Sequence, residues 1–365
     1  MSHYQNRSIW TTDHQTVEVV DQRYLPHQIV IVELKNTEEI FRAIREMWIR
    51  GAPLIGATAA FGYYYAIEEA RSQPDPETYI QEKYNYLNSA RPTAVNLAWA
   101  LARQRAADQQ QDWESRLQTA WQTALDIVEE DVAICHAIGQ HGLEIIRALA
   151  AKHSDRSIQI LTHCNAGRMA TVAWGTATAP IYLAHEAGIP VHVWVDETRP
   201  RNQGARITAW ELGQKGIPHT VITDNTGGLL MQQGQVDMCI VGTDRTTYKG
   251  DVANKIGTYL KALAAHDNDV PFYVALPSTT LDWTIADGKD IPIETRSDRE
   301  VTHIWGWDAS SQSVKEVRLT PESSKGLNYG FDVTPAKYVT GLVTERGICQ
   351  ANEAEIRALF PEHAS

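Results

Sequence analysis

IQILTH (158–163) is the first of a series of short apolar runs that decide the fold, and it is followed by VHVWVD (191–196), HTVIT (219–223), VDMCIV (236–241) and PFYVAL (271–276). A helical pattern lies between each run and the next. Continuous apolar strands that alternate with helices are typical of a parallel sheet with helices on both faces. We therefore predict a Rossmann-like α/β domain with a parallel sheet.

The residues before this region have a different pattern. VEVV (17–20) and IVIV (29–32) predict a small β-hairpin. Apolar residues at helical spacing then predict helices from 37 to the break at 50–53, with Thr37 as N-cap, and over 54–71, 94–108 and 113–150. We expect a mostly helical N-terminal domain, residues 1–125, and a Rossmann-like α/β catalytic domain, residues 126–365, with the break anywhere between about residues 120 and 155.

The composition of the chain argues against nucleic acids and membranes as binding partners. The chain has 365 residues and a formal net charge of -12, so we expect no nucleic-acid partner. A few well-placed cations still suffice to bind a phosphorylated small molecule. The 4 cysteines form no CxxC pair, the N-terminal residues lack the apolar core of a signal peptide, and LIGATAAFGYYYAI (54–67) is too short to cross a bilayer. We expect a cytoplasmic protein with no membrane partner.

Polar side chains gather where the predicted strands end. The groups are THCN (162–165), DETR (196–199), TDNT (223–226) and GTDR (242–245). Ligands of open parallel sheets bind outside the carboxyl ends of the strands. The sequence therefore predicts a site built from these four strand ends.

Two residues at these strand ends suit catalytic chemistry. Asp244 ends a strand that is apolar on both faces, and burial would raise the pKa of its carboxyl and suit it to donate a proton. Cys164 precedes a helix predicted to begin near Met169, and that helix start, together with Arg168, would favour the thiolate. The ordinary alternatives are a loop carboxylate and a small side chain that fills a tight turn. Asp251 is expected to cap the next helix.

Other residues are placed to bind an anion. Asn254 and Lys255 are predicted to open a helix, whose backbone N–H groups and dipole attract a phosphate. The remaining candidates lie at breaks or ahead of helices: Arg50-Gly51-Ala52, Arg91 before a helix predicted to open at Thr93, Arg199 and Gln203. Each has an ordinary alternative as a surface lysine, a helix–helix turn or a structural side chain.

Common cofactor and hydrolase motifs are missing from the sequence. No GxGxxG follows a predicted strand, and the chain contains neither a P-loop nor a GxSxG elbow. His136 and His141 are 5 residues apart, which is the wrong spacing for a metal pair on one helix face. We expect neither a cofactor nor a metal ion.

A series of longer motifs resembles one family. They run in order from about residue 40 to 347: IRGAPLIGATAAFG, SARPTAVNLAWAL, ILTHCNAG, VDETRPRNQGARITAWEL, DNTGG, VGTDR, GDVANKIGTY, PFYVALPSTTLDW, IPIETR and FDVTPAKYVTGLVTERG. They resemble the 5-methylthioribose-1-phosphate isomerases. That family shares its fold with ribose-1,5-bisphosphate isomerases and with regulatory subunits of the eukaryotic exchange factor for translation initiation.

The resemblance implies a metal-free homodimeric aldose–ketose isomerase of methionine salvage. Such an enzyme converts 5-methylthioribose 1-phosphate to 5-methylthioribulose 1-phosphate. The family's catalytic residues fall on Cys164 and Asp244. Its substrate-binding residues fall on Arg50, Gly51, Ala52, Arg91, Gln203, Asn254 and Lys255.

The chemistry assigns roles to these residue types. A phosphate on the anomeric oxygen prevents spontaneous ring opening, so the enzyme must protonate the ring oxygen and move a hydrogen from C2 to C1. Asp244 fits the general acid and later the base, and Cys164 fits a group that assists the hydrogen transfer. A cis-enolate and a direct hydride shift both stay open. A hydride shift would favour an apolar pocket, to which Trp48, Trp174 and Tyr259 are expected to contribute.

Two other functions stay open from the sequence. An isomerase of ribose 1,5-bisphosphate would need a second cationic pocket for the 5-phosphate, where a methylthio group needs an apolar one. A non-catalytic sugar-phosphate sensor would need phosphate contacts but no proton donor. The presence of both Cys164 and Asp244 favours an enzyme over a sensor.

Overall fold

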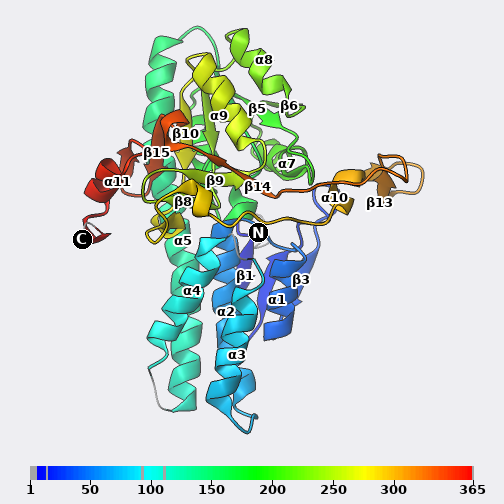
Figure 1. Cartoon of the computed structure of the whole chain (residues 1–365), viewed down its shortest axis with the longest axis vertical. Coiled ribbons are helices and arrows are strands. Elements are labelled where there is room, and N and C mark those ends of the chain that lie inside the picture. The colour runs from blue at the N-terminus through cyan, green and yellow to red at the C-terminus, as the bar shows by residue number, and fades with distance from the viewer. Residues whose placement is uncertain (1–5, 14, 92–93, 110–111, 364–365) are drawn as a thin grey trace.

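The N-terminal region is built around one buried helix, α2 (Ala52–Ala70), in a computed structural model that describes residues 6–13, 15–91, 94–109 and 112–363. The α2 sequence is apolar on all sides, so its neighbours must surround it. They are α1 (Thr37–Arg45), α3 (Pro76–Asn88), α4 (Val95–Ala107), the first half of α5 (Trp113–Lys152) and the antiparallel sheet of β1 (Ile9–Thr11), β2 (Val17–Val20) and β3 (Ile31–Leu34) (Figure 1).

The predicted hairpin and the later helices of this region are confirmed, but the helix expected to run from 37 to the break at 50–53 ends at Arg45. Helix α3 was not predicted, and the cap of α1 also differs. Strand β2 pairs with β3 as the hairpin requires, and β1 adds a further strand. The cap of α1 is Asn36 and not Thr37, because the Asn36 side chain accepts a hydrogen bond from the Glu39 N–H at 2.9 Å. The predicted start of α4 at Thr93 lies outside the described residues.

One long helix, α5 (Trp113–Lys152), connects the two regions (Figure 1). Its first half contributes Leu117 and Ile127 to the N-terminal core. Its second half contributes Ile138 and Ile146 to the core on one face of the main sheet. The expected break near residue 125 falls within this helix, so the limits of the two domains stay a prediction.

The main sheet has the strand order β16-β15-β10-β7-β4-β5-β6, and every pairing except that of β16 is parallel. The predicted strands are confirmed as β4 (Ile158–Thr162), β5 (Val191–Asp196), β6 (His219–Ile222), β7 (Met238–Val241) and β10 (Phe272–Ala275). The sequence patterns do not indicate β15 (Gly341–Thr344) and β16 (Gly347–Cys349), which are short and begin with glycine.

Helices cover both faces of this sheet. Alternate residues of β4 point to opposite sides, so Ile160 packs with α5, α6 (Thr178–Glu186) and α7 (Ala209–Gln214). On the other face, Leu161 belongs to a core that α8 (Thr226–Gln232), α9 (Thr258–Asp267) and α11 (Glu353–Leu359) cover. The predicted α/β fold with a Rossmann-like parallel sheet is therefore confirmed.

A smaller sheet changes the expected setting of Asn254 and Lys255. It has the order β11-β8-β9-β14, formed by β8 (Arg245–Thr247), β9 (Val252–Lys255), β11 (Leu281–Asp282) and β14 (Phe331–Thr334). Asn254 and Lys255 end strand β9 and do not open a helix, because β9 pairs antiparallel with β14, so that Lys255 lies opposite Phe331. The helix prediction is wrong at this point because a partner distant in sequence decides the local structure.

The carboxylates around this sheet also differ from the prediction. Asp332 of β14 accepts hydrogen bonds from the N–H groups of Gly257 at 2.7 Å and Tyr259 at 3.1 Å, so it caps α9. The N-terminus of α9 is therefore already occupied by a carboxylate. Asp251 accepts instead from the N–H groups of Gly288 and Ala336, both at 2.9 Å, and holds two loops together. Asp251 is not a helix cap.

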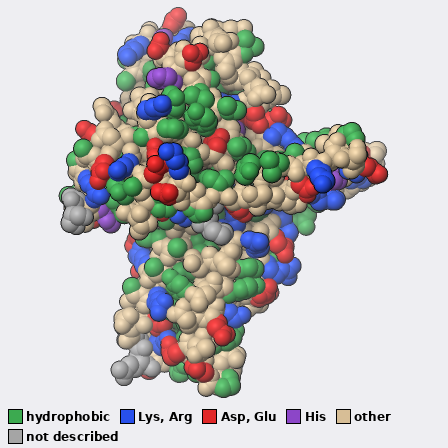
Figure 2. Space-filling model, in the orientation of Figure 1, with side chains coloured by type: hydrophobic (Ala, Val, Ile, Leu, Met, Phe, Trp, Pro, Cys, Tyr) green, Lys and Arg blue, Asp and Glu red, His purple; other side chains and the backbone are tan. Residues whose placement is uncertain are grey.

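A hairpin of β12 (His303–Asp308) and β13 (Ser313–Arg318) follows the short helix α10 (Arg299–Thr302). It projects as an arm from the side of the molecule (Figure 1), and it stands out beyond the rest of the surface in the space-filling view (Figure 2). Among the described residues, no helix combines the length and the apolar character that crossing a bilayer requires.

Candidate active site

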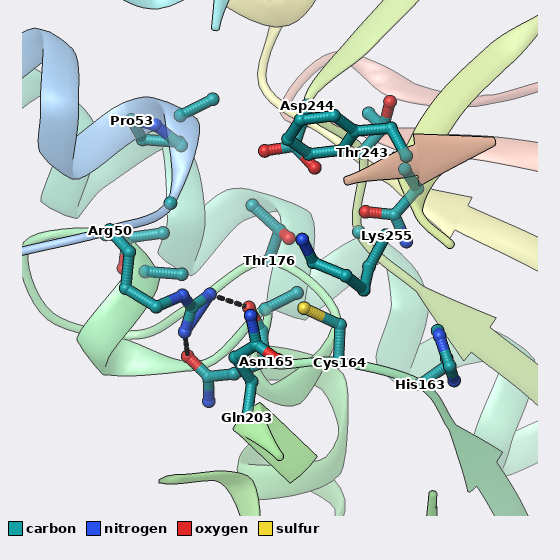
Figure 3. A pocket seen from close by; sticks show the side chains of 18 of the residues that line it. Arg50, Pro53, His163, Cys164, Asn165, Thr176, Gln203, Thr243, Asp244 and Lys255 are labelled. Carbon is teal, nitrogen blue, oxygen red and sulfur yellow. Dashed lines mark hydrogen bonds between the residues drawn. The ribbon is translucent and has the colours of Figure 1, made fainter. Parts of the chain in front are cut away.

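A pocket lies where the ends of β4 and β7 face the N-terminal region (Figure 3). The predicted site residues all line it, namely Arg50, Gly51, Ala52, Arg91, Cys164, Gln203, Asp244, Asn254 and Lys255. Segments that are far apart in the sequence supply them: the turn before α2, the break before α4, two strand ends of the main sheet, and the end of β9. Tertiary folding therefore brings the complete predicted set to one place.

The four predicted strand ends contribute unequally. The ends of β4 and β7 line the pocket, whereas the ends of β5 and β6 support it from behind. Asp224, after β6, accepts hydrogen bonds from the N–H groups of Thr198 and Arg199, both at 2.7 Å. The Arg199 guanidinium donates to the carbonyls of Pro200 and Val301, so it is a structural side chain here.

Cys164 has an unusual backbone conformation. Its φ of 69° lies in the left-handed region, which costs a residue other than glycine on the order of 1–3 kcal/mol. Two hydroxyls hold it there. The Thr198 hydroxyl accepts from the Cys164 N–H at 2.8 Å, and the Thr208 hydroxyl donates to the Cys164 carbonyl at 2.7 Å. The thiol thus enters the pocket from a clamped and strained turn (Figure 3).

The predicted stabilisation of a Cys164 thiolate by a helix start is wrong. Burial raises the pKa of the Cys164 thiol, although the nearby charges of Arg50 and Lys255 and a hydrogen bond from the Asn165 N–H act against this effect. Met169 belongs to a short 3-10 turn, Arg168–Ala170, and not to a helix with aligned N–H groups. Arg168 lies 5.7 Å over the ring of Trp210. The help for the thiolate comes from the cations that line the pocket and from the Asn165 N–H.

Asp244 has the raised pKa that its position suggests. Its N–H donates to the Ala253 carbonyl at 2.9 Å, which fixes the turn after β7 beside β9. Burial raises the pKa of the Asp244 carboxyl, although Lys255, Arg91 and Arg50 all act in the opposite direction. A carboxyl in this setting keeps its proton to a higher pH than an exposed aspartate, as a general acid requires.

Lys255 lies between the two candidate catalytic groups (Figure 3). It is 5% exposed, its Nζ donates to the Gly330 carbonyl at 2.9 Å, and the same atom lies 4.6 Å from the centre of the Phe331 ring. Burial lowers the pKa of Lys255, while Cys164 and Asp244 raise it. The ammonium is therefore close enough to both groups to couple their charges.

Arg50 faces Lys255 across the pocket. Its guanidinium donates to the side-chain oxygen of Asn165 at 2.6 Å and to the Asn165 carbonyl (Figure 3). Gly51 follows with a φ of 93°, and a Cβ there would lie 2.3 Å from the Ala170 carbonyl oxygen. Only glycine allows the turn before α2 to approach the Ala170 backbone so closely.

Two side chains in the pocket have polar atoms without a partner. Arg91 is 5% exposed and Gln203 is 3% exposed. Arg91 Nε and Nη1 and Gln203 Oε1 make no hydrogen bond to any part of the chain that the structure describes, although Arg91 Nε lies 3.4 Å from a Glu294 oxygen. Buried polar groups are almost always paired. These atoms are therefore suited to contact a bound polar molecule.

The expected aromatic contribution is wrong. Trp48, Trp174 and Tyr259 do not line the described pocket. Its apolar surface comes from Met47, Ala52, Pro53, Ala166, Ala170, Pro277 and Phe331. Asn165 and Thr198 belong to the strand-end groups that the sequence predicts at the site, although it gives them no role of their own, and sequence reasoning missed Thr208. Thr208 belongs to no such group.

The likeness to known proteins agrees with this geometry. Residues 48–351 match the initiation factor 2 subunit family. A methylthioribose-1-phosphate isomerase from Paramagnetospirillum magneticum is 57% identical over 360 residues, covering 98% of each chain. The solved 5-methylthioribose 1-phosphate isomerase from Pyrococcus horikoshii superposes with a TM-score of 0.81 at 35% identity and covers 99% of both chains.

A second solved structure carries a different name. It is titled translation initiation factor eIF-2B, subunit delta, from A. fulgidus, with a TM-score of 0.78 at 36% identity, covering 98% of this chain and 99% of that one. The curated isomerase from Paramagnetospirillum magneticum is much more similar in sequence, at 57%. The chain therefore belongs to the initiation factor 2 subunit family and, within it, to the methylthioribose-1-phosphate isomerases.

Proposed function

We propose that this isomerase converts 5-methylthioribose 1-phosphate to 5-methylthioribulose 1-phosphate, with Asp244 as general acid and base and Cys164 assisting the hydrogen transfer. The observation that carries the proposal is the meeting of Cys164, Asp244 and Lys255 in one pocket lined by Arg50 and Arg91. The high identity to curated enzymes with this name supports the choice of substrate. The apolar part of the pocket surface suits a methylthio group better than a second phosphate.

In this proposal, the Asp244 carboxyl group both donates the first proton and accepts the last one. Asp244 gives its proton to the ring oxygen as the bond from that oxygen to C1 breaks, which leaves C1 electron-poor. In the hydride route, hydrogen moves with its electron pair from C2 to C1. The C2 hydroxyl then loses its proton to the Asp244 carboxylate and becomes the ketone. In the enolate route, the C2 hydrogen leaves as a proton to Cys164 and returns from it to C1. The C2 hydroxyl of the enol gives its proton to the Asp244 carboxylate as the ketone forms. Both routes restore the starting state of Asp244.

The remaining predicted residues bind the substrate in this proposal. Arg50, Arg91 and Lys255 supply positive charge for the phosphate. Arg91 and Gln203 contribute the polar atoms that lack a partner. Asn254 lies next to Lys255 at the end of β9, and Gly51 and Ala52 offer a closely approaching backbone. The N-terminus of α9 takes no part, because Asp332 already caps it.

The test is turnover with both candidate sugars. Purified protein is incubated with 5-methylthioribose 1-phosphate or with ribose 1,5-bisphosphate, and ketose formation is followed. We expect turnover of the first sugar. Cys164→Ala and Asp244→Asn should each lower kcat by at least about 100-fold while substrate affinity stays within about tenfold. Faster turnover of the bisphosphate would refute the substrate, and retained turnover in either variant would refute that residue's role.

The cellular setting is also proposed from the family resemblance. We infer a cytoplasmic homodimer that serves methionine salvage and needs no metal. Light scattering of the purified protein should give twice the mass of one chain. Turnover should persist after dialysis against a chelator. A monomer, or loss of activity that added metal restores, would contradict the respective inference.

A further inference from the structure

His163 precedes Cys164 at the end of β4 and also lines the pocket, and both of its ring nitrogens face hydrogen-bond acceptors. Its exposed fraction is 1%. Nδ1 lies 2.8 Å from Asp196 Oδ2, and Nε2 lies 2.9 Å from the carbonyl oxygen of Ile256. A carbonyl oxygen only accepts hydrogen bonds, so Nε2 must carry a hydrogen. Whether Nδ1 also carries a hydrogen depends on whether the Asp196 carboxyl accepts or donates the hydrogen bond between them.

The Asp196 carboxyl lies between the His163 ring and an ammonium group. Its Oδ2 atom lies 3.2 Å from the ammonium of Lys261, and both side chains are buried. An ionised carboxylate accepts and cannot donate, so Nδ1 of His163 also carries a hydrogen. With hydrogens on both nitrogens, the ring is an imidazolium. It takes part in a buried row of alternating charges, Lys261, Asp196 and His163.

Lys261 takes the place that a metal ion would occupy. The ligand atoms of His163, Asp196 and Asp224 lie within 4.8 Å of one another, which is close enough for a metal site. The Lys261 ammonium contacts the Asp196 carboxylate and also donates to the Asp224 carbonyl. A second cation there would meet the ammonium at close range. We therefore interpret the cluster as an ion-pair network.

The imidazole ring joins the two halves of the pocket. His163 is the residue before Cys164 in the chain, and its ring contacts the carbonyl of Ile256, the residue after Lys255. Gly257 fits closely against it, because a Cβ on Gly257 would lie 3.0 Å from the ring carbon Cε1 of His163. The ring therefore fixes how far the end of β9 can lie from the end of β4.

We propose that His163 is a positioning residue: as an imidazolium held by Asp196, it sets the distance from Lys255 to Cys164 and keeps a positive charge near the thiol. The proposal rests on the proposed function, in which Cys164 and Lys255 meet the substrate. The charged groups that face His163 are Asp196 on β5, Lys261 on α9 and Asp332 on β14. Its formal charge is thus compensated by carboxylates on two different strands.

The first test reads the protonation state in the unmodified protein. Nitrogen-15 NMR of histidine-labelled protein is recorded at about pH 8, well above the ordinary histidine pKa of about 6.5. His163→Gln identifies the signals. We expect both ring nitrogens of His163 to be protonated, and one of them to lose its proton in Asp196→Asn. An unprotonated ring nitrogen in the unmodified protein at that pH would overturn the proposal. This measurement does not depend on which sugar the enzyme converts.

The second test separates positioning from binding. His163→Gln should lower kcat by about 10- to 100-fold, because small displacements of reacting groups have effects of this size, while KM stays within about threefold. His266→Gln is the matched control, since His266 is an exposed residue on α9, and it should leave both constants unchanged. An unchanged kcat in folded His163→Gln would refute the positioning role. If the unmodified protein converts neither sugar but His163 is doubly protonated, the proposed function fails and the charge assignment stands.

Discussion

The hydroxyl of Thr208 provides a sharp test of how Cys164 is held. This side chain is 1% exposed, donates to the Cys164 carbonyl at 2.7 Å and accepts from the Asn165 amide at 3.1 Å. Thr208→Val keeps the shape and removes both hydrogen bonds. Each buried group that loses its partner costs about 1–3 kcal/mol, so the loss of two should lower the unfolding free energy by roughly 2–6 kcal/mol. Thr208→Ser keeps the hydroxyl and serves as the control.

The same variant should also affect turnover. The left-handed backbone of Cys164 stores on the order of 1–3 kcal/mol, which the turn can release once one clamp is lost. The thiol then moves away from Lys255, and kcat should fall by about 10- to 100-fold. Urea unfolding measures the first effect and ketose formation the second. A stable and fully active Thr208→Val would refute the reasoning, and a destabilised but fully active variant would limit Thr208 to a structural role.

Three further predictions follow from the pocket and from α9. Arg91→Gln should raise KM by roughly 10- to 100-fold, the size expected for losing a charged hydrogen bond, and an unchanged KM would exclude Arg91 from binding. Because burial raises the pKa of Asp244, the folded chain binds its proton more tightly than the unfolded chain, so ionisation of Asp244 costs stability as pH rises. Asp244→Asn should therefore gain stability relative to the unmodified protein as pH rises above about 4, the ordinary pKa of aspartate, and a relative loss in urea unfolding would contradict this sign. Asp332→Ala should lower the unfolding free energy by about 0.5–2 kcal/mol by uncapping α9, and no change would show that the cap is unimportant.

Local patterns in the sequence predicted most of the secondary structure. Apolar periodicity depends only on residues that are close in the chain, so it predicts the strands β4, β5, β6 and β7 and the long helix α5. The gathering of Cys164 and Asp244 followed from a general rule about strand ends. The failures came where local patterns were ambiguous. The segment that ends in Asn254 and Lys255 resembles a helix start, but its pairing with β14 makes it a strand.

The sequence by itself determined the parallel sheet, the family and the residues of the site, because these follow from local periodicity and from motifs that can be read directly. Tertiary structure decided how those residues act. Thr198 and Thr208 clamp Cys164 in a left-handed turn, Asp332 occupies the start of α9, and His163 joins the ends of β4 and β9. Each of these contacts links positions far apart in the chain, and the burial that shifts the pKa of Asp244 exists only once the two regions have met.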